Sequence, residues 1–477
     1  MIRLTRIELD GVKNIHHGAI DLCRPGRNGD GRADDEVSSV TGIYGQNGSG
    51  KTSVIEAIQV LRLLMVGEEL KGERAGILVN LAGGAGSHAT LHAEIQVDDT
   101  LAVYTVVLEA CDTGLHVVRE TLAVRPDGDR RRILVDYRMA RDGETGLLTP
   151  TVSPTGAWNS LTALQHADDL LRQEAALAYS QNRSLLFSKE FSTQFQRISF
   201  LLHVQESTLP AARRTALDRT LDPLLHVIER LARFADNGIR VVTTRQGASV
   251  CFGYTPFMHG GRFDILDIGR PCFVPAAIRR EIEQMVEQAN LVLPVVIPGL
   301  KLECEMKEDV DEAGEAGARV FLYSSRDDDG VRIRIPFWAE SEGIRRIVGI
   351  LSLLVRMFNE TDTCIAIDEI DSGIFEVLLG DILRVLAQQG RGQLVFTAHN
   401  LRVLEVLDHK SIVFSTADPD NRFVQFANVR AGNNLRDMYI RSVSLDAENT
   451  RLAQKVKTAH VAVALSRAGR VTGGRDE

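Results

Sequence analysis

The feature of this sequence that constrains its fold most is the eight-residue segment Gly45–Thr52, which reads GQNGSGKT. It satisfies every fixed position of the pattern G-x-x-x-x-G-K-[ST]. The segment 38–44 before it, SSVTGIY, predicts a buried strand, and residues 53–65 after it have the periodicity of a helix. A glycine-rich turn between a strand and a helix is typical of α/β proteins, which is the fold class that we predict.

The same segment also indicates what the turn binds. Its glycines let the backbone curl so that N–H groups point at phosphate oxygens, and the helix N-terminus adds a partial positive charge. Lys51 would lie beside the β- and γ-phosphates, and the Thr52 hydroxyl would be a ligand of Mg²⁺. The motif does not distinguish ATP from GTP. The predicted nucleotide-binding residues are Gly45, Gln46, Asn47, Gly48, Ser49, Gly50, Lys51, Thr52 and Ser53.

A second segment, 363–369, ends in two carboxylates, Asp368 and Glu369. A buried strand ending there places both at the carboxyl edge of the sheet, where open α/β sheets bind ligands. We expect Asp368 to hold Mg²⁺, directly or through water, and Glu369 to orient or deprotonate an attacking water. Lys51 and Asp368 are 317 residues apart (368 − 51 = 317), so a large insertion must separate two halves of one nucleotide-binding fold.

Two further segments carry weaker signals. The segment 393–400, QLVFTAHN, reads as a strand running into Thr397, Ala398 and His399. His399 could contact the γ-phosphate and report its presence, although a lone histidine is more often structural. Ser341 and Gly343 precede an apolar helix and could offer a hydroxyl and a backbone N–H to an anion. The alternative is that Ser341 only caps that helix, with an acidic residue in the first turn.

The pattern of the whole sequence predicts that the chain is divided into three parts. Residues 1–160 would form an amino-terminal ATPase lobe with the glycine-rich loop and an antiparallel meander over 89–137. Residues 161–300 read as a mainly helical insertion whose helices are too broken for a long coiled coil. Residues 301–477 would form the carboxy-terminal lobe. Smaller expectations are strands at 2–9, 18–22 and 301–335, a loop at 140–160, and helices at 276–293 and near the end.

Composition excludes some classes of protein and leaves others open. The net charge of −9 and pI of about 5.8 argue against a generally basic nucleic-acid-binding protein. No apolar run is long enough for a membrane span, and the six cysteines form no CxxC pair, so we expect a cytoplasmic protein without a membrane partner. A local basic surface could still bind DNA. Its candidate arginines are Arg213, Arg214, Arg219, Arg230, Arg233, Arg240 and Arg245.

Taken together, GQNGSGKT, ESEGIRRI, CIAIDEIDSG and FTAHN resemble the ABC-type ATPases of the SMC/RecF/OLD group. They look most like stand-alone bacterial OLD-like AAA family ATPases of antiviral defence systems, over about residues 1–110 and 300–440. The resemblance implies a P-loop ABC-type ATPase head with an antiparallel β sub-sheet and an inserted helical subdomain. The implied cofactors are ATP and Mg²⁺.

The resemblance also implies how two copies would meet. In a head-to-tail dimer, Ser341 and Gly343 of one copy would act in trans on the nucleotide of the other. Asp371 would lie near the seam and His399 would be the switch histidine. The sequence reads SEG where transporters and SMC heads have LSGG, which weakens the expectation of a tight trans contact. The glutamine that couples γ-phosphate to the helical lobe is not unique, since Gln181, Gln194 and Gln196 are all candidates.

Only 77 residues follow Asn400 (477 − 400 = 77), and they contain no acidic set typical of the Toprim nuclease of OLD proteins. The chain would then be the ATPase sensor of an anti-phage defence system that controls a separate effector protein such as a nuclease or toxin. One alternative is a RecF/SMC-like DNA-binding ATPase in repair or maintenance. Another is a scaffold that only binds nucleotide, against which the presence of Glu369 weighs.

Overall fold

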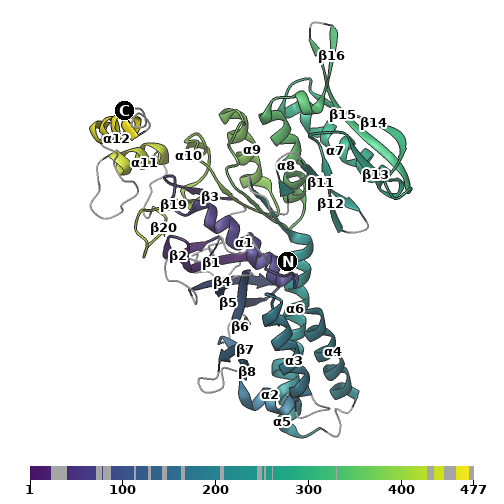
Figure 1. Cartoon of the computed structure of the whole chain (residues 1–477), viewed down its shortest axis with the longest axis vertical. Coiled ribbons are helices and arrows are strands. Elements are labelled where there is room, and N and C mark those ends of the chain that lie inside the picture. The colour runs from purple at the N-terminus through teal and green to yellow at the C-terminus, as the bar shows by residue number, and fades with distance from the viewer. Residues whose placement is uncertain are drawn as a thin grey trace, which may run out of the picture.

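The chain folds into an α/β protein built on two large sheets (Figure 1). The computed structural model describes residues 1–22, 40–70, 78, 87–111, 114–126, 130–141, 148–162, 167–204, 209–243, 250–251, 254–259, 262–328, 330–426, 434–444 and 458–471. Within these ranges the predicted fold class, α/β with an antiparallel sub-sheet, is confirmed.

The central sheet has the strand order β10-β9-β17-β18-β3-β19-β20. All neighbours are parallel except β19 and β20. Its inner strands are buried throughout, as parallel strands covered on both faces must be. The strands are β3 (Val40–Tyr44), β9 (Ile239–Thr243), β10 (Val250–Cys251), β17 (Cys364–Ile367), β18 (Gln393–Thr397), β19 (Ile412–Ser415) and β20 (Phe423–Val424).

The second sheet is antiparallel, with the order β2-β1-β4-β5-β6-β7-β8. It confirms the predicted meander and the two amino-terminal strands. Its strands are β1 (Ile2–Val12), β2 (Ile15–Asp21), β4 (His88–Val97), β5 (Thr100–Cys111), β6 (Gly114–Pro126), β7 (Arg132–Arg141) and β8 (Leu148–Ser153).

The prediction of a loop at 140–160 is wrong in its second half. Residues 148–153 form β8, which pairs with β7, and helix α2 (Thr155–Thr162) follows. The glycine, threonine and proline content suggested a loop, but the β-branched residues suit a strand and β7 offers an open edge to pair with.

Helix α1 (Lys51–Met65) fills the space between the two sheets. Eleven of its fifteen residues are buried, and its apolar side chains belong to the core cluster that also contains the inner faces of both sheets. The Gln393 side chain joins the sheets directly, because its Oε1 accepts from Leu4 N at 2.9 Å and its Nε2 donates to Leu4 O at 2.8 Å. The other face of the central sheet is covered by α8 (Glu342–Asn359) and α9 (Glu376–Gln389).

Between β8 and β9 the chain forms a helical region at one end of the molecule (Figure 1). Between residues 239 and 275, however, the segment expected to be mainly helical forms strands β9 to β13, and β9 lies inside the central sheet, before the helix α7 (Arg279–Val296) that ends this segment. The domain boundaries themselves stay a prediction. The helices here are α2, α3 (Ala167–Ser180), α4 (Lys189–Val204), α5 (Ala211–Ala216) and α6 (Asp222–Arg233), with π-helical turns at Leu217–Leu221 and Phe234–Gly238.

A smaller sheet lies at the opposite end of the molecule (Figure 1) and packs against α7 (Arg279–Val296). Its strands are β13 (Cys272–Pro275), β14 (Lys301–Val310), β15 (Ala316–Asp328) and β16 (Val331–Pro336), beside a hairpin of β11 (Tyr254–His259) and β12 (Arg262–Asp267). The predicted helix at 276–293 and strands at 301–335 are thereby confirmed. The chain continues to α10 (Val403–Val406), α11 (Leu435–Ser444) and α12 (Thr458–Val471). Among the described residues, no helix has the length and apolar character needed to cross a membrane.

Candidate functional site

The glycine-rich loop connects the end of β3 to the start of α1. Gly48 and Gly50 have φ angles of 78° and 92°, a region that side-chain-bearing residues rarely occupy. At Gly45 a Cβ atom would lie 2.0 Å from Ser415 Oγ on β19, so only glycine fits. On its other side the loop is fixed by Asn14, whose Nδ2 donates to Gly48 O at 2.6 Å. The loop is thus held from both sheets in a curled shape.

Lys51 points into this curl. Its ammonium group donates to Gly45 O at 2.8 Å and to Gln46 O at 2.9 Å, and the residue is only 6% exposed. Burial lowers the pKa of Lys51, while the nearby carboxylates of Asp368, Glu369 and Asp371 act in the opposite direction. A positive charge with little water around it is suited to attract an anion.

The distant acidic pair meets this loop. Thr52 and Asp368 are 316 positions apart, yet Thr52 Oγ1 donates to Asp368 Oδ1 at 3.2 Å. The same carboxylate oxygen accepts from Thr397 Oγ1 at 2.6 Å. This meeting follows from the strand order, because β18 lies between β3 and β17 and its last residue is Thr397. The structure therefore brings the two predicted metal ligands together.

The donor set suits a hard cation that is shared with a nucleotide. Thr52 and Asp368 offer hydroxyl and carboxylate oxygens, the ligands that Mg²⁺ prefers, and two protein ligands are usual when phosphates supply others. Over the described part of the chain, no group of three or more His, Cys, Asp or Glu residues could hold a metal ion without such help. The residues therefore fit Mg²⁺ bound with a triphosphate.

Glu369 has an unusual backbone conformation. Its φ of 50° lies in the left-handed region, which costs a non-glycine residue roughly 1–2 kcal/mol. The backbone is held on both sides. Glu369 N donates to Thr397 Oγ1 at 2.8 Å, while Arg346 on α8 donates to the carbonyl oxygens of Asp368 and Glu369. The side chain is half-buried and follows directly after the Asp368 ligand.

Sequence reasoning did not find Arg346, and it named Thr397 only as part of a strand. In ESEGIRRI two arginines stand side by side, and the residue type alone does not show which of them is buried. The helical period could have identified Arg346 as a residue on the buried face of α8, but not its partners.

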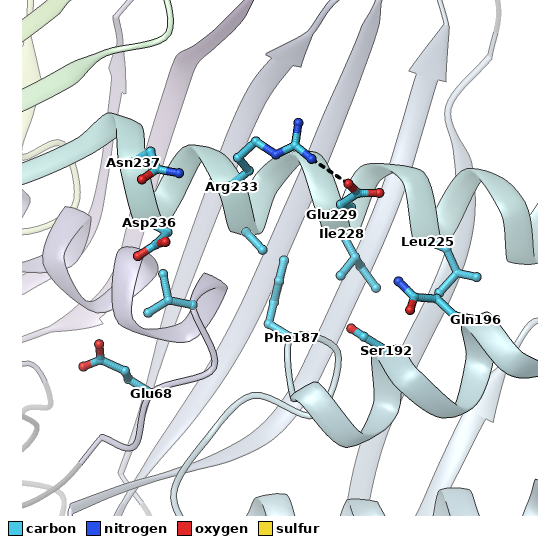
Figure 2. A pocket seen from close by; sticks show the side chains of 12 residues that line it. Glu68, Phe187, Ser192, Gln196, Leu225, Ile228, Glu229, Arg233, Asp236 and Asn237 are labelled. Carbon is cyan, nitrogen blue, oxygen red and sulfur yellow. Dashed lines mark hydrogen bonds and ion pairs between the residues drawn. The ribbon is translucent and has the colours of Figure 1, made fainter. Parts of the chain in front are cut away.

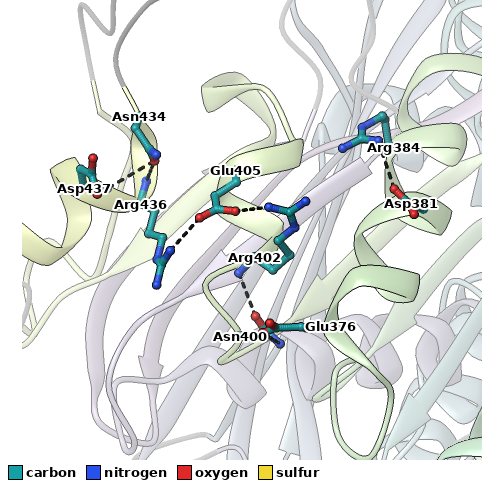
Figure 3. A network of polar contacts seen from close by, with 9 residues as sticks. All are labelled: Glu376, Asp381, Arg384, Asn400, Arg402, Glu405, Asn434, Arg436 and Asp437. Atoms are coloured by element: carbon teal, nitrogen blue, oxygen red, sulfur yellow. Dashed lines mark hydrogen bonds and ion pairs between the residues drawn. The ribbon is translucent and has the colours of Figure 1, made fainter.

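His399 is exposed at the turn after β18. Its backbone N donates to Asp371 Oδ2 at 2.8 Å, and Asn400 N donates to the same oxygen at 2.6 Å. Asp371, which the resemblance implies near a dimer seam, therefore fixes the turn that carries His399 in its own chain. Figure 3 shows how this turn continues: Asn400 donates to Glu376 on α9, and Glu405 joins Arg402 to Arg436 on α11.

Ser341 and Gly343 begin helix α8. Ser341 is exposed and caps the helix, accepting from Ile344 N at 3.4 Å, as the capping alternative predicts. A Cβ atom on Gly343 would lie 2.0 Å from Gly373 O, so glycine is needed for α8 to approach the segment after the acidic pair. Neither observation tests a contact in trans.

The candidate glutamines lie elsewhere. Gln196 lines a cleft of about 610 Å³ between α4 and α6, together with Phe187, Ile228 and Val66 (Figure 2). Val66 follows the last residue of α1, and a helix of 15 residues is about 22 Å long, so this cleft is far from the glycine-rich loop. Gln194 is on the same helix, and Gln181 follows α3. No coupling glutamine is identified among the three.

Most of the candidate DNA-binding arginines have partners within the chain. Arg213 Nε donates to Ser160 O at 3.0 Å, Arg230 pairs with Asp98 and Arg233 pairs with Glu229. Arg240 is 3% exposed inside β9, and Arg245 lies outside the described residues. Arg214 and Arg219 are exposed. Of the described candidates, Arg240 is buried, and Arg230 and Arg233 are each paired with a carboxylate, which offsets their positive charge.

No family model matches the chain, and no curated protein matches it. Among solved structures, it is similar to the Smc head domain with an extended coiled coil bound to the C-terminal domain of ScpA from Pyrococcus furiosus. That match has 13% identity and a TM-score of 0.41, and covers 90% of this chain and 97% of that chain. The SMC head domain from Thermotoga maritima matches with 13% identity, coverage of 89% and 99%, and a TM-score of 0.33. Likeness at this level assigns no function, which depends on the residues of the site.

Proposed function

We propose that the chain binds ATP with Mg²⁺ and hydrolyses it. The observation that carries this proposal is the contact between Thr52 Oγ1 and Asp368 Oδ1 at 3.2 Å, beside the buried ammonium group of Lys51. The Thr52 hydroxyl and Lys51 at the end of the glycine-rich loop, together with the Asp368 carboxylate beside them, have the chemistry needed to hold a triphosphate and its cation.

Each residue has a separate part in the proposed reaction. Backbone N–H groups of the loop and Lys51 bind the phosphates, and Thr52 with Asp368 would hold Mg²⁺. When bound, Mg²⁺ supplies positive charge that offsets the charge developing on the phosphate oxygens. Glu369, directly after Asp368, orients a water molecule and accepts its proton. His399 would contact the γ-phosphate, and Asp371 fixes the turn that carries it.

The proposed partner at the nucleotide edge is a second copy of this chain, arranged head to tail. Ser341 is exposed, and so are two aromatic residues close in sequence to the contact between Gly343 and Gly373. Trp338 precedes Gly343, and Phe375 follows Gly373. Trp338 and Phe375 are 55% and 69% exposed, and aromatic side chains are enriched in protein interfaces. ATP that binds the closed dimer better than the open one would make the assembly a switch.

We extend the proposal to a sensor ATPase of an anti-phage defence system that controls a separate nuclease or toxin. It rests on the sequence resemblance alone, and copurification of such an effector with the tagged chain would support it. A RecF/SMC-like DNA clamp is the second candidate, favoured by the exposed Arg214 and Arg219. A clamp predicts DNA affinity that falls steeply with salt, because phosphate contacts release counterions.

The direct test of hydrolysis is phosphate release from ATP with and without Mg²⁺. We expect Asp368→Asn to lower the rate by roughly 10²-fold, because the cation loses its charged protein ligand. Asp381→Asn is the matched control, since this exposed aspartate on α9 pairs with Arg384 at 3.1 Å. No phosphate release by the wild-type chain, or equal rates for Asp368→Asn and wild type, would contradict the proposal.

A further inference from the structure

Arg346 is a buried cation on α8 that contacts the backbone of the acidic pair. Its Nη2 donates to Asp368 O at 3.2 Å and also to Glu369 O, and the residue is only 4% exposed. Burial lowers the pKa of Arg346 to about 10, while Glu369, Asp371 and other carboxylates act in the opposite direction. The guanidinium therefore remains charged at neutral pH, and its hydrogen bonds to the carbonyls are charge-assisted.

These hydrogen bonds bear on the direction of the Glu369 side chain. A residue with a φ of 50° relaxes to a negative φ unless its surroundings hold it, and that change would redirect its carboxylate. Thr397 holds the N–H of Glu369 at 2.8 Å. Arg346 holds the two carbonyl oxygens on either side of the same residue. The conformation thus depends on two side chains from different elements, β18 and α8.

Helix α8 contacts this segment a second time. Gly343, in its first turn, lies so close to Gly373 that a Cβ atom would meet Gly373 O at 2.0 Å. Gly343 and Arg346 are three positions apart, which places them on one face of the helix. Because a helix moves as a rigid element, its contacts with Gly373 and with Glu369 are linked, and the exposed Ser341 lies at the same end.

We propose that Arg346 is a positioning residue that holds the Glu369 carboxylate in the orientation that activates water, and that it links this orientation to the start of α8. The inference rests on the proposed hydrolysis of ATP by Glu369. It adds a residue that touches neither nucleotide nor cation, and a route by which a partner at Ser341 alters turnover without contacting the carboxylate.

The first experiment separates turnover from binding. Arg346→Met removes every donor, and we expect turnover to fall by roughly 10²-fold, the scale of a misplaced catalytic group. ATP affinity should change by less than about threefold, because Arg346 touches neither the nucleotide nor the cation. Arg346→Lys keeps a charged donor and should retain an intermediate rate, and it carries the test if the Met variant does not fold. Arg356→Gln, on the same helix and paired with Glu360 at 2.5 Å, is the control.

The second experiment is a double-mutant cycle with Glu369→Gln. If Arg346 acts through the carboxylate, Arg346→Lys should slow the wild-type chain but have no further effect on Glu369→Gln. Multiplied losses in the double variant, or an unchanged rate for both Arg346 variants, would overturn the inference while leaving the proposed function intact. Wild-type turnover by Glu369→Gln would instead contradict the proposed function itself.

Discussion

The two large sheets each bury a carboxylate that accepts hydrogen bonds from hydroxyl groups, yet the two carboxylates differ in the other groups that lie beside them. Asp368, on the parallel sheet, is 4% exposed and accepts from the hydroxyls of Thr52 and Thr397. Glu120, on β6 of the antiparallel sheet, is 0% exposed and accepts from Tyr104 Oη at 2.7 Å and Ser184 Oγ at 2.5 Å.

The surroundings explain the difference. Leu185 N also donates to Glu120 at 2.8 Å, so protein groups alone satisfy this carboxyl group and anchor the segment after α3 to the sheet. Asp368 instead lies at the carboxyl edge of β17, beside Lys51 and a loop rich in N–H groups. Burial and hydrogen bonding by themselves do not identify a functional carboxylate. The position at the carboxyl edge of the sheet and the nearby buried ammonium group of Lys51 do.

The largest expected effect is at the site that contains Asp368 and Lys51. Lys51→Ala removes the buried charge and should weaken ATP binding by about 4 kcal/mol, or roughly 10³-fold. The measurement is ATP titration by calorimetry at constant Mg²⁺. Lys410→Ala, which changes an exposed lysine after α10, is the control and should bind ATP as wild type does. Unchanged affinity in Lys51→Ala would remove the distinction between the two carboxylate sites.

The next largest effect is expected at Glu120 in the antiparallel sheet. Glu120→Ala leaves the donors of Tyr104, Ser184 and Leu185 without their acceptor, and should lower the free energy of unfolding by about 3 kcal/mol. Denaturant unfolding measures this loss, and the affinity for ATP of the folded fraction should not change. A stable Glu120→Ala variant with impaired ATP binding would mean that Glu120 belongs to the nucleotide site.

Glu369→Gln tests the proposed role of Glu369 in activating water. The amide keeps the shape of the side chain but cannot accept a proton, so phosphate release should slow by roughly 10²-fold while ATP binding is retained. We also expect the ATP-loaded variant to self-associate more tightly, which light scattering would detect. Rapid turnover in this variant would show that another group activates water.

The smallest effect is a pH dependence of stability. Burial raises the pKa of Glu120 above its ordinary value of 4.5, so the folded chain binds the proton more tightly than the unfolded chain does. Between the unfolded and the raised folded pKa, the free energy of unfolding therefore falls as pH rises, by at most about 1.4 kcal/mol per pH unit. Glu120→Gln should lose this component when the two chains are compared over the same pH range. A free energy of unfolding that changes with pH in the same way in both chains would contradict this role of Glu120.

The comparison also explains how much the sequence could predict. Local sequence patterns predict the glycine-rich loop, the strand before it and the helix after it. A local pattern also predicts the apolar strand before Asp368 and Glu369. The hydroxyl of Thr397, the Arg346 contacts and the Glu120 cluster depend on strand order and helix packing, which local periodicity does not specify. The strand at 148–153 was missed because its partner edge, β7, is what stabilises it.

The most direct test of the central claim is a double-mutant cycle on Thr52 and Asp368, read out as the Mg²⁺ dependence of ATP binding. If both residues hold one ion, Thr52→Ala and Asp368→Asn should each weaken the Mg²⁺ dependence, and the double variant should be little worse than Asp368→Asn alone. Independent losses that multiply in the double variant, or a Mg²⁺ dependence that neither substitution alters, would contradict a shared cation site.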